Sequence, residues 1–280
     1  MHNPTTTIPG FELLQYLGGG PLTQVYSARR YNSDEIVVVK FLRPEWENDP
    51  TACQLLRREA VAGLSVSHPH LVHVREANIL HKPYFLVMDL LVGESLRDRL
   101  KRAYALDLRT AMWIGRQTAE AIAALHRIGF IHGDIKPENV CLVDAGTAIL
   151  LDLGFAHRPG ENDTLFAQGY VLGTANYLAP EMCGPHPTAD LASDLFSFGV
   201  MLFEMLTGEL PYPPGSPTET LARHREQPAA CLSDYPGHWP APLDELLAGL
   251  CARRPAQRPR IQYVVQQLMT LEIATLRTCA

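Results

Sequence analysis

The stretch that decides how this chain folds is HGDIKPEN, at residues 132–139. It follows a long amphipathic helical pattern and precedes a short strand pattern, and DLG at residues 152–154 follows a second short strand. Aspartate and asparagine in loops usually form turns, so each of these residues alone indicates little. Together, their charges and their spacing indicate a reaction centre that is carried on loops.

These two stretches contain the side chains that phosphoryl transfer needs. The reaction requires an acceptor for the hydroxyl proton, oxygen ligands for Mg²⁺ and a cation at the γ-phosphate. Asp134 suits the first role and Lys136 the last. Asn139 and Asp152 offer an amide and a carboxylate oxygen, which are hard ligands of the kind that Mg²⁺ prefers. The sequence therefore predicts ATP and Mg²⁺ as the cofactors of a phosphotransferase.

A lysine and a glutamate upstream fit the same chemistry. Lys40 ends the apolar run VVV at residues 37–39, and a lysine in a buried strand is unfavourable unless an anion meets it. Glu59, on the following helical pattern, is a suitable partner that would hold Lys40 against the α- and β-phosphates. For this pair taken alone, the alternative stays open that the lysine reaches solvent and the glutamate is solvated.

A glycine cluster, LGGG at residues 17–20, precedes a strand-like segment. Glycine lets backbone N–H groups approach phosphates without a Cβ in the way, although such a cluster between strands is often only a turn. Two other phosphate-binding motifs are excluded. No G-x-x-x-x-G-K-[ST] occurs, and a dinucleotide-binding fingerprint would open a helix rather than a strand.

Strand patterns come first along the chain and helical patterns second. The strand-like segments of the first part are residues 13–17, 24–28, 36–41 and 84–88. One helix interrupts them, beginning at Asp49-Pro50 and running towards Leu64.

The second part is mainly helical from Gly93 onwards. An amphipathic helix covers residues 108–125, and residues 195–206 form an apolar helix that we expect at the centre of the second lobe. Two short strands, 140–143 and 148–151, flank a turn at 144–146. This order predicts an α+β fold of two lobes. Its expected parts are a flexible lead-in (1–10), an N-terminal lobe (about 11–88), a hinge (89–93), a C-terminal lobe (94–270) and a short extension (271–280).

The composition is that of an ordinary globular protein. The 280 residues carry a formal net charge of −6, which gives no sign of nucleic-acid binding. No apolar run reaches the ~18 residues that a membrane span requires. The six cysteines are scattered, without a C-x-x-C pair, which favours reduced thiols and a cytoplasmic location.

Over residues 11–269 the chain resembles a eukaryotic-type serine/threonine protein kinase, in the form common in bacteria. The resemblance rests on the glycine-rich loop, Lys40 and Glu59. It also rests on HGDIKPEN at residues 132–139, DLG at residues 152–154 and APE at residues 179–181. It implies a two-lobed fold with an N-terminal antiparallel sheet plus one helix and a larger, mainly helical C-terminal lobe. It also implies ATP as the phosphate donor and a protein as the acceptor.

The resemblance also implies roles for single residues. Leu17, Gly18, Gly20, Val25, Val38, Lys40, Asp89, Leu91 and Cys141 are expected to bind ATP, with Asp89 and Leu91 offering hinge backbone to adenine. Residues 155–178 correspond to the activation segment. Thr174 in this segment and Lys136 in the catalytic loop are both typical of the serine/threonine class. Glu181 is expected to pair with buried Arg258, and Asp194 opens the apolar helix; these three roles are structural.

Two departures from the family pattern keep other functions open. Thr23 replaces the third glycine of the loop, and Val38 replaces a small alanine and narrows the adenine slot. A catalytically weak ATP-binding module is therefore one alternative. Small-molecule phosphotransferases such as the aminoglycoside and choline kinases, which share the HGD triplet, are a second. Against the second stand Lys136, Thr174 and Arg258.

A third departure leads to a prediction about regulation. Gly133 stands where the family usually has an arginine that grips an activation-segment phosphate. We therefore expect phosphorylation of Thr164, Tyr170 or another segment residue to be unnecessary for activity. The measurement is the turnover of enzyme that mass spectrometry shows to be unphosphorylated. Strict dependence on a segment phosphate would contradict the prediction.

Overall fold

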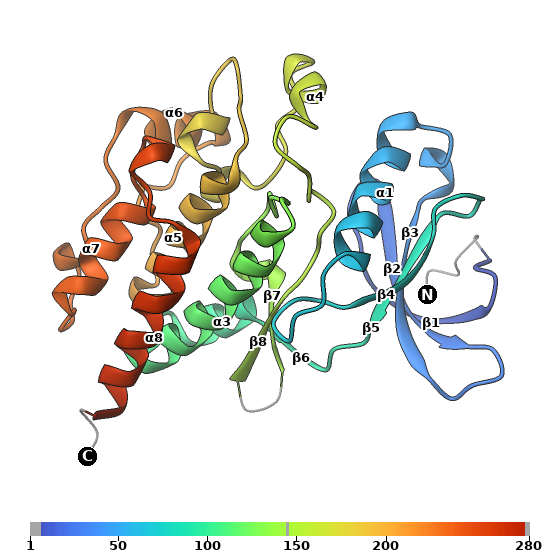
Figure 1. Ribbon diagram of the computed structural model, residues 1–280, viewed down its shortest axis with the longest axis horizontal. Coiled ribbons are helices and arrows are strands. Elements are labelled where there is room, and N and C mark those ends of the chain that lie inside the picture. The colour runs from blue at the N-terminus through green and yellow to red at the C-terminus, as the bar shows by residue number, and fades with distance from the viewer. Residues whose placement is uncertain (1–6, 144–145, 278–280) are drawn as a thin grey trace.

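The computed structural model describes residues 7–143 and 146–277, and these form two lobes (Figure 1). The N-terminal lobe is a five-stranded antiparallel sheet in the order β1-β2-β3-β5-β4, with helix α1 beside it. The elements are β1 (Phe11–Gly18), β2 (Thr23–Arg30), β3 (Ile36–Leu42), α1 (Pro50–Leu64), β4 (Val74–Asn78) and β5 (Phe85–Asp89).

The C-terminal lobe is mainly helical and carries a small three-stranded sheet in the order β6-β7-β8. Its helix α3 packs against both α5 and α8, and the short helix α4 stands apart at the top of Figure 1. The elements are β6 (Gly93–Ser95), α2 (Leu96–Ala103), α3 (Leu108–Arg127), β7 (Val140–Val143), β8 (Thr147–Leu150), α4 (Asp163–Ala167), α5 (Leu191–Thr207), α6 (Pro217–Glu226), α7 (Ala241–Leu250) and α8 (Ile261–Arg277).

Local sequence explains where the two decisive helices begin and end. Asp49 caps α1 by accepting a hydrogen bond from the Ala52 backbone N–H at 2.7 Å. Asp190 and Ser193 form a capping box at the start of α5, and Gly208 ends it in the left-handed conformation. All of residues 193–207 except Ser197 are buried, so α5 forms the centre of the C-terminal lobe, as its apolar sequence predicts.

The α+β two-lobed fold expected from the sequence is confirmed. The expected segments did not include β4, β6, α2, α4, α6, α7 and α8. Strand β4 gives little sequence signal, because VREAN has no apolar alternation beyond its first residue. Helix α2 gives little as well, because its eight residues are mostly charged. Of the expected turn at 144–146, residues 144 and 145 lie outside the described part of the chain.

Residues near both ends of the described chain pack into the core. Ile8 is fully buried in the core of the N-terminal sheet, whereas residues 1–6 are outside the described part. Helix α8 continues past residue 270 to Arg277, and Leu271 is buried. Among residues 7–143 and 146–277, no helix combines the length and apolar character that crossing a bilayer needs.

Gly63, one turn after Glu59 on α1, allows this helix to lie close to β4. A Cβ at this position would be 2.2 Å from the Val74 Cγ2 atom, which is far inside van der Waals contact. We expect Gly63→Ala to push α1 outward and to lower the free energy of unfolding by about 1–3 kcal/mol. Urea titration measures the change, and affinity for ATP should fall with it because Glu59 moves too.

Gly249→Ala on α7 is the matched control. There the nearest atom to a new Cβ is Pro259 Cδ at an ordinary 3.6 Å, so the better helix propensity of alanine should stabilise by up to ~1 kcal/mol. If Gly63→Ala raises the free energy of unfolding as much as Gly249→Ala does, the packing between α1 and β4 is loose.

Candidate active site

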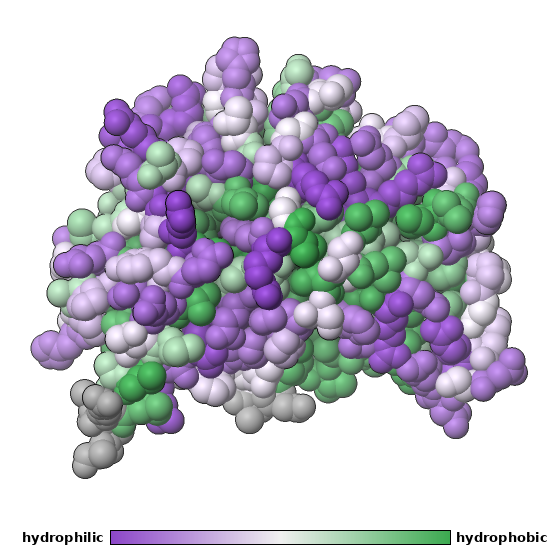
Figure 2. All heavy atoms as spheres, in the orientation of Figure 1, coloured by the Kyte–Doolittle hydropathy of each residue, from purple (hydrophilic) through white to green (hydrophobic). Residues whose placement is uncertain are grey.

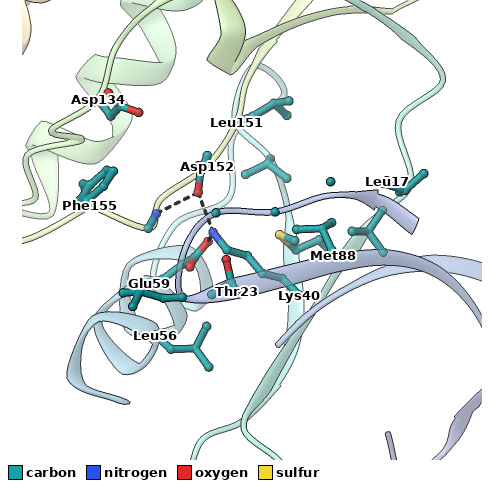
Figure 3. Close-up of a pocket in the computed structure, with 18 of the residues that line it drawn as sticks. Leu17, Thr23, Lys40, Leu56, Glu59, Met88, Asp134, Leu151, Asp152 and Phe155 are labelled. Atoms are coloured by element: carbon teal, nitrogen blue, oxygen red, sulfur yellow. Dashed lines mark hydrogen bonds and ion pairs between the residues drawn. The ribbon is translucent and has the colours of Figure 1, made fainter. Parts of the chain in front are cut away.

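A cleft of about 630 Å³ separates the two lobes. Figure 2 shows apolar side chains gathered where the lobes meet, and Figure 3 shows the interior of the cleft. The structure brings all the expected ATP-binding residues into its lining: Leu17, Gly18, Gly20, Val25, Val38, Lys40, Asp89, Leu91 and Cys141. Apolar walls with a few charged groups at one end are typical of a ligand site.

Lys40 lies between two carboxylates at the inner end of the cleft (Figure 3). Its Nζ donates to Glu59 Oε1 at 2.8 Å and to Asp152 Oδ1 at 2.6 Å. Strand β3 supplies Lys40, α1 supplies Glu59, and the loop after β8 supplies Asp152. The bridging lysine therefore ties together the sheet, the helix and the catalytic side of the C-terminal lobe.

The ionisation of these three groups follows from burial and mutual attraction. Burial alone would lower the pKa of Lys40, but the nearby carboxylates outweigh it and raise this pKa above its ordinary value. Lys40 in turn holds the pKa of Asp152 at about 2. Burial raises the pKa of Glu59, against the opposing attraction of Lys40. Lys40 and Asp152 are thus charged at neutral pH.

Asp134, on the loop between α3 and β7, is the centre of a second cluster. Its Oδ1 accepts from Thr174 Oγ1 at 2.8 Å, and its Oδ2 lies 2.7 Å from Lys136 Nζ. Lys136 Nζ also donates to Thr174 Oγ1 at 2.7 Å. Asn139 Nδ2 donates to Asp134 Oδ2 at 3.0 Å and to the Asp134 carbonyl at 2.8 Å. The carboxylate is therefore held in one orientation by three side chains.

Asp194, at the start of α5, fixes the backbone of the loop that carries Asp134. Its carboxylate accepts from the N–H groups of His132 (2.8 Å) and Gly133 (3.0 Å). It also bonds His126 Nε2 at 2.9 Å, a contact that the sequence analysis missed. Burial would raise the pKa of Asp194, but the His126 bond outweighs it and keeps this pKa low. The loop thus rests on a buried, charged support.

Gly133 is suited to its place for a steric reason. Its φ of +81° is in the left-handed region, and a Cβ there would lie 2.9 Å from the Phe155 carbonyl oxygen. An arginine at this position would need the loop and the activation segment to separate. The backbone conformation therefore disfavours the arginine that the family usually has at this position.

Glu181 and Arg258, which are not among the residues that line the cleft, form a buried pair. Arg258 donates from Nη1 to Glu181 Oε1 at 2.6 Å and from Nη2 to Oε2 at 2.7 Å. It also donates to the Ala192 and Ala252 carbonyls. This bidentate pair joins the stretch just after the activation segment to the segment before α8.

Arg97 is the centre of a hydrogen-bond network that was not predicted from the sequence. Arg97 on α2 bonds Glu138 Oε1 at 2.8 Å, Glu204 Oε1 at 2.6 Å and the Tyr177 hydroxyl. An arginine on a short charged helix gives no sequence signal of such long-range contacts. The network braces the catalytic loop, at Glu138, against the activation segment, at Tyr177.

The fold and the two charged clusters have the arrangement of a protein kinase domain. The chain belongs to the protein kinase domain family, which matches residues 11–269. This confirms the resemblance expected from the sequence. Proteins of this family use ATP, usually with Mg²⁺, to phosphorylate protein substrates.

Several curated bacterial proteins are similar to this chain. Serine/threonine-protein kinase PknD of Mycobacterium tuberculosis is 33% identical over 250 residues, which are 89% of this chain and 37% of that protein. A probable serine/threonine-protein kinase of Clostridium perfringens is 31% identical over 248 residues (89% and 36%), and serine/threonine-protein kinase PrkC of Bacillus subtilis is 28% identical over 267 residues (95% and 40%). The chain thus spans only 36–40% of the length of these relatives.

Proposed function

We propose that this chain transfers the γ-phosphate of ATP to serine or threonine residues of a protein. The observation that carries the proposal is the orientation of Asp134 by Lys136 and Thr174, beside a cleft that contains the Lys40–Glu59 pair. The names of the similar proteins support the same acceptor class.

Each charged side chain has a separate role in the proposed reaction. Asp134 accepts the proton of the acceptor hydroxyl, and Lys136 neutralises charge on the γ-phosphate. Lys40, held by Glu59, binds the α- and β-phosphates. Because Lys136 also bonds Thr174, the acceptor site and the activation segment are fixed together.

Asn139 and Asp152 have the chemistry of a magnesium site. The Asn139 amide nitrogen donates to the carbonyl and to the carboxylate of Asp134, so the Asn139 carbonyl oxygen is the atom that would bind a cation. Asp152 is ionised, with its pKa held at about 2 by Lys40. Bound Mg²⁺ would neutralise charge that develops on the phosphates.

The magnesium assignment predicts the effect of Asp152→Ala. We expect affinity for ATP in the presence of Mg²⁺ to fall by ~10–100-fold, the range seen when support for a bound metal is lost. Isothermal titration with and without Mg²⁺ measures this. Unchanged affinity in Mg²⁺ would place the metal elsewhere.

The proposal as a whole is tested with γ-labelled ATP, Mg²⁺ and a generic serine/threonine substrate. Label on phosphoserine or phosphothreonine supports it, and label on phosphotyrosine contradicts the acceptor class. Nucleotide binding without any transfer would indicate an ATP-binding module, in which Thr23 and Val38 restrict the cleft.

A further inference from the structure

Arg58 and Glu59 are consecutive on α1 and serve different neighbours. Glu59 points to Lys40, whereas Arg58 contacts the activation segment about a hundred residues later in the chain. Arg58 Nη2 donates to the Glu161 carbonyl at 2.6 Å, and Nη1 donates to Asn162 Oδ1. Its Nε is 3.7 Å from Glu161 Oε2, and the Arg58 side chain is only 13% exposed.

The turn that receives Arg58 is itself anchored. Asn162 is 1% exposed and directly precedes α4, and Phe166 on that helix packs edge-on against His157 at 6.5 Å. His157 exchanges two backbone hydrogen bonds with Ile131, of 2.8 and 3.1 Å. Ile131 directly precedes the catalytic loop. A continuous set of contacts therefore runs from α1 through the 158–162 turn to that loop.

The Arg58 guanidinium combines two hydrogen bonds to neutral oxygens with an ion pair. The hydrogen bonds go to the Glu161 carbonyl and the Asn162 amide oxygen, and the Glu161 carboxylate lies 3.7 Å from Nε. Glu161 is kept in place by the Arg158 backbone N–H, which donates to Glu161 Oε2 at 2.8 Å. The chain thus supplies its own negative charge on the activation segment, close to α1.

We propose that Arg58 is a positioning residue, which holds α1 on the 158–162 turn so that Glu59 stays paired with Lys40 without a phosphate on the activation segment. This inference rests on the proposed kinase function. Because a helix moves as a unit, a shift of Arg58 would carry Glu59 with it. Gly133 offers no cation to the activation segment, so the contact with Arg58 on α1 holds this segment instead.

The test compares Arg58→Ala with Arg57→Ala in unphosphorylated enzyme. Arg57 lies on the same helix but bonds the Ile79 carbonyl instead, so it is the matched control. We expect Arg58→Ala to lower kcat about fivefold to tenfold and Arg57→Ala to change it less than about twofold, as is typical of coupling through a positioning residue. Arg58→Lys should recover part of the loss.

A double variant shows whether Arg58 acts through Glu59. In a Glu59→Gln background, Arg58→Ala should add less than about twofold to the loss in kcat, because the pair it positions is already broken. Losses that multiply, or an Arg58→Ala enzyme as active as Arg57→Ala, would overturn the inference.

Hydrogen exchange provides a measurement that does not depend on catalysis. Amides of residues 157–166 and of α1 should exchange faster in Arg58→Ala than in wild type or Arg57→Ala. Unchanged exchange would overturn the inference even in an active enzyme. If wild type transfers no phosphate, the proposed function fails, and the exchange comparison still tests the contact.

Discussion

Asp134→Asn is expected to lower kcat by ~10²–10⁴-fold, the usual contribution of a general base. Asparagine has nearly the same shape, so Thr174 can still donate to its carbonyl oxygen, but the amide cannot accept the acceptor proton. Affinity for ATP should stay within about twofold, because the lost group acts on the acceptor hydroxyl. Initial rates at saturating ATP and an equilibrium titration with ATP measure the two quantities.

Asp98→Asn is the control for this experiment. Asp98 is an exposed residue of α2 that pairs with Lys101, so its loss should not affect turnover. An Asp134→Asn enzyme within about tenfold of wild type would contradict the assignment of the base, since such residual activity exceeds what the loss of a general base leaves. A large loss of ATP affinity would instead indicate a disordered cleft.

The second large effect concerns stability. Arg258→Met is expected to lower the free energy of unfolding by ~3–5 kcal/mol, because it leaves a buried carboxylate without its partner. The Arg258 side chain is fully buried, and Glu181 is 10% exposed. Methionine fills much of the same volume, so the loss reflects charge and hydrogen bonding rather than a cavity. Urea denaturation gives the value.

The double variant Glu181→Gln, Arg258→Met separates these causes. It should be more stable than Arg258→Met alone, because no unpaired charge is left inside. Arg254→Met, at an exposed neighbouring position, should change stability by less than about 0.5 kcal/mol. If Arg258→Met behaves like Arg254→Met, the pair contributes little to the fold.

The sequence predicted the parts of the molecule whose residues carry their own signal. Apolar runs marked β3 and α5, and a capping aspartate followed by proline marked the start of α1. The charged residues of the cleft could be found because the proposed phosphoryl transfer needs a fixed set of groups. Glu59 could be paired with Lys40 because few buried lysines lack an anion.

What the sequence could not show depends on contacts between distant segments. His126 is one of several polar residues on α3, and only the folded chain brings it to Asp194. Arg58 looks like any surface arginine until the activation segment lies beside it. The closeness of Gly63 to Val74 is likewise a property of packing, since glycine in a helix has no distinctive pattern.

The buried position of Cys141 has a consequence for the response of the cleft to oxidants. Burial raises the pKa of this thiol, so little of it is present as the reactive thiolate at neutral pH. Peroxide and electrophiles attack the thiolate, and they should therefore reach Cys141 slowly. A reactive cysteine in the nucleotide pocket would be a point of oxidative inactivation. Here the apolar wall that would contact adenine in the proposed complex also keeps the Cys141 thiol protonated, and so protects the pocket from oxidation.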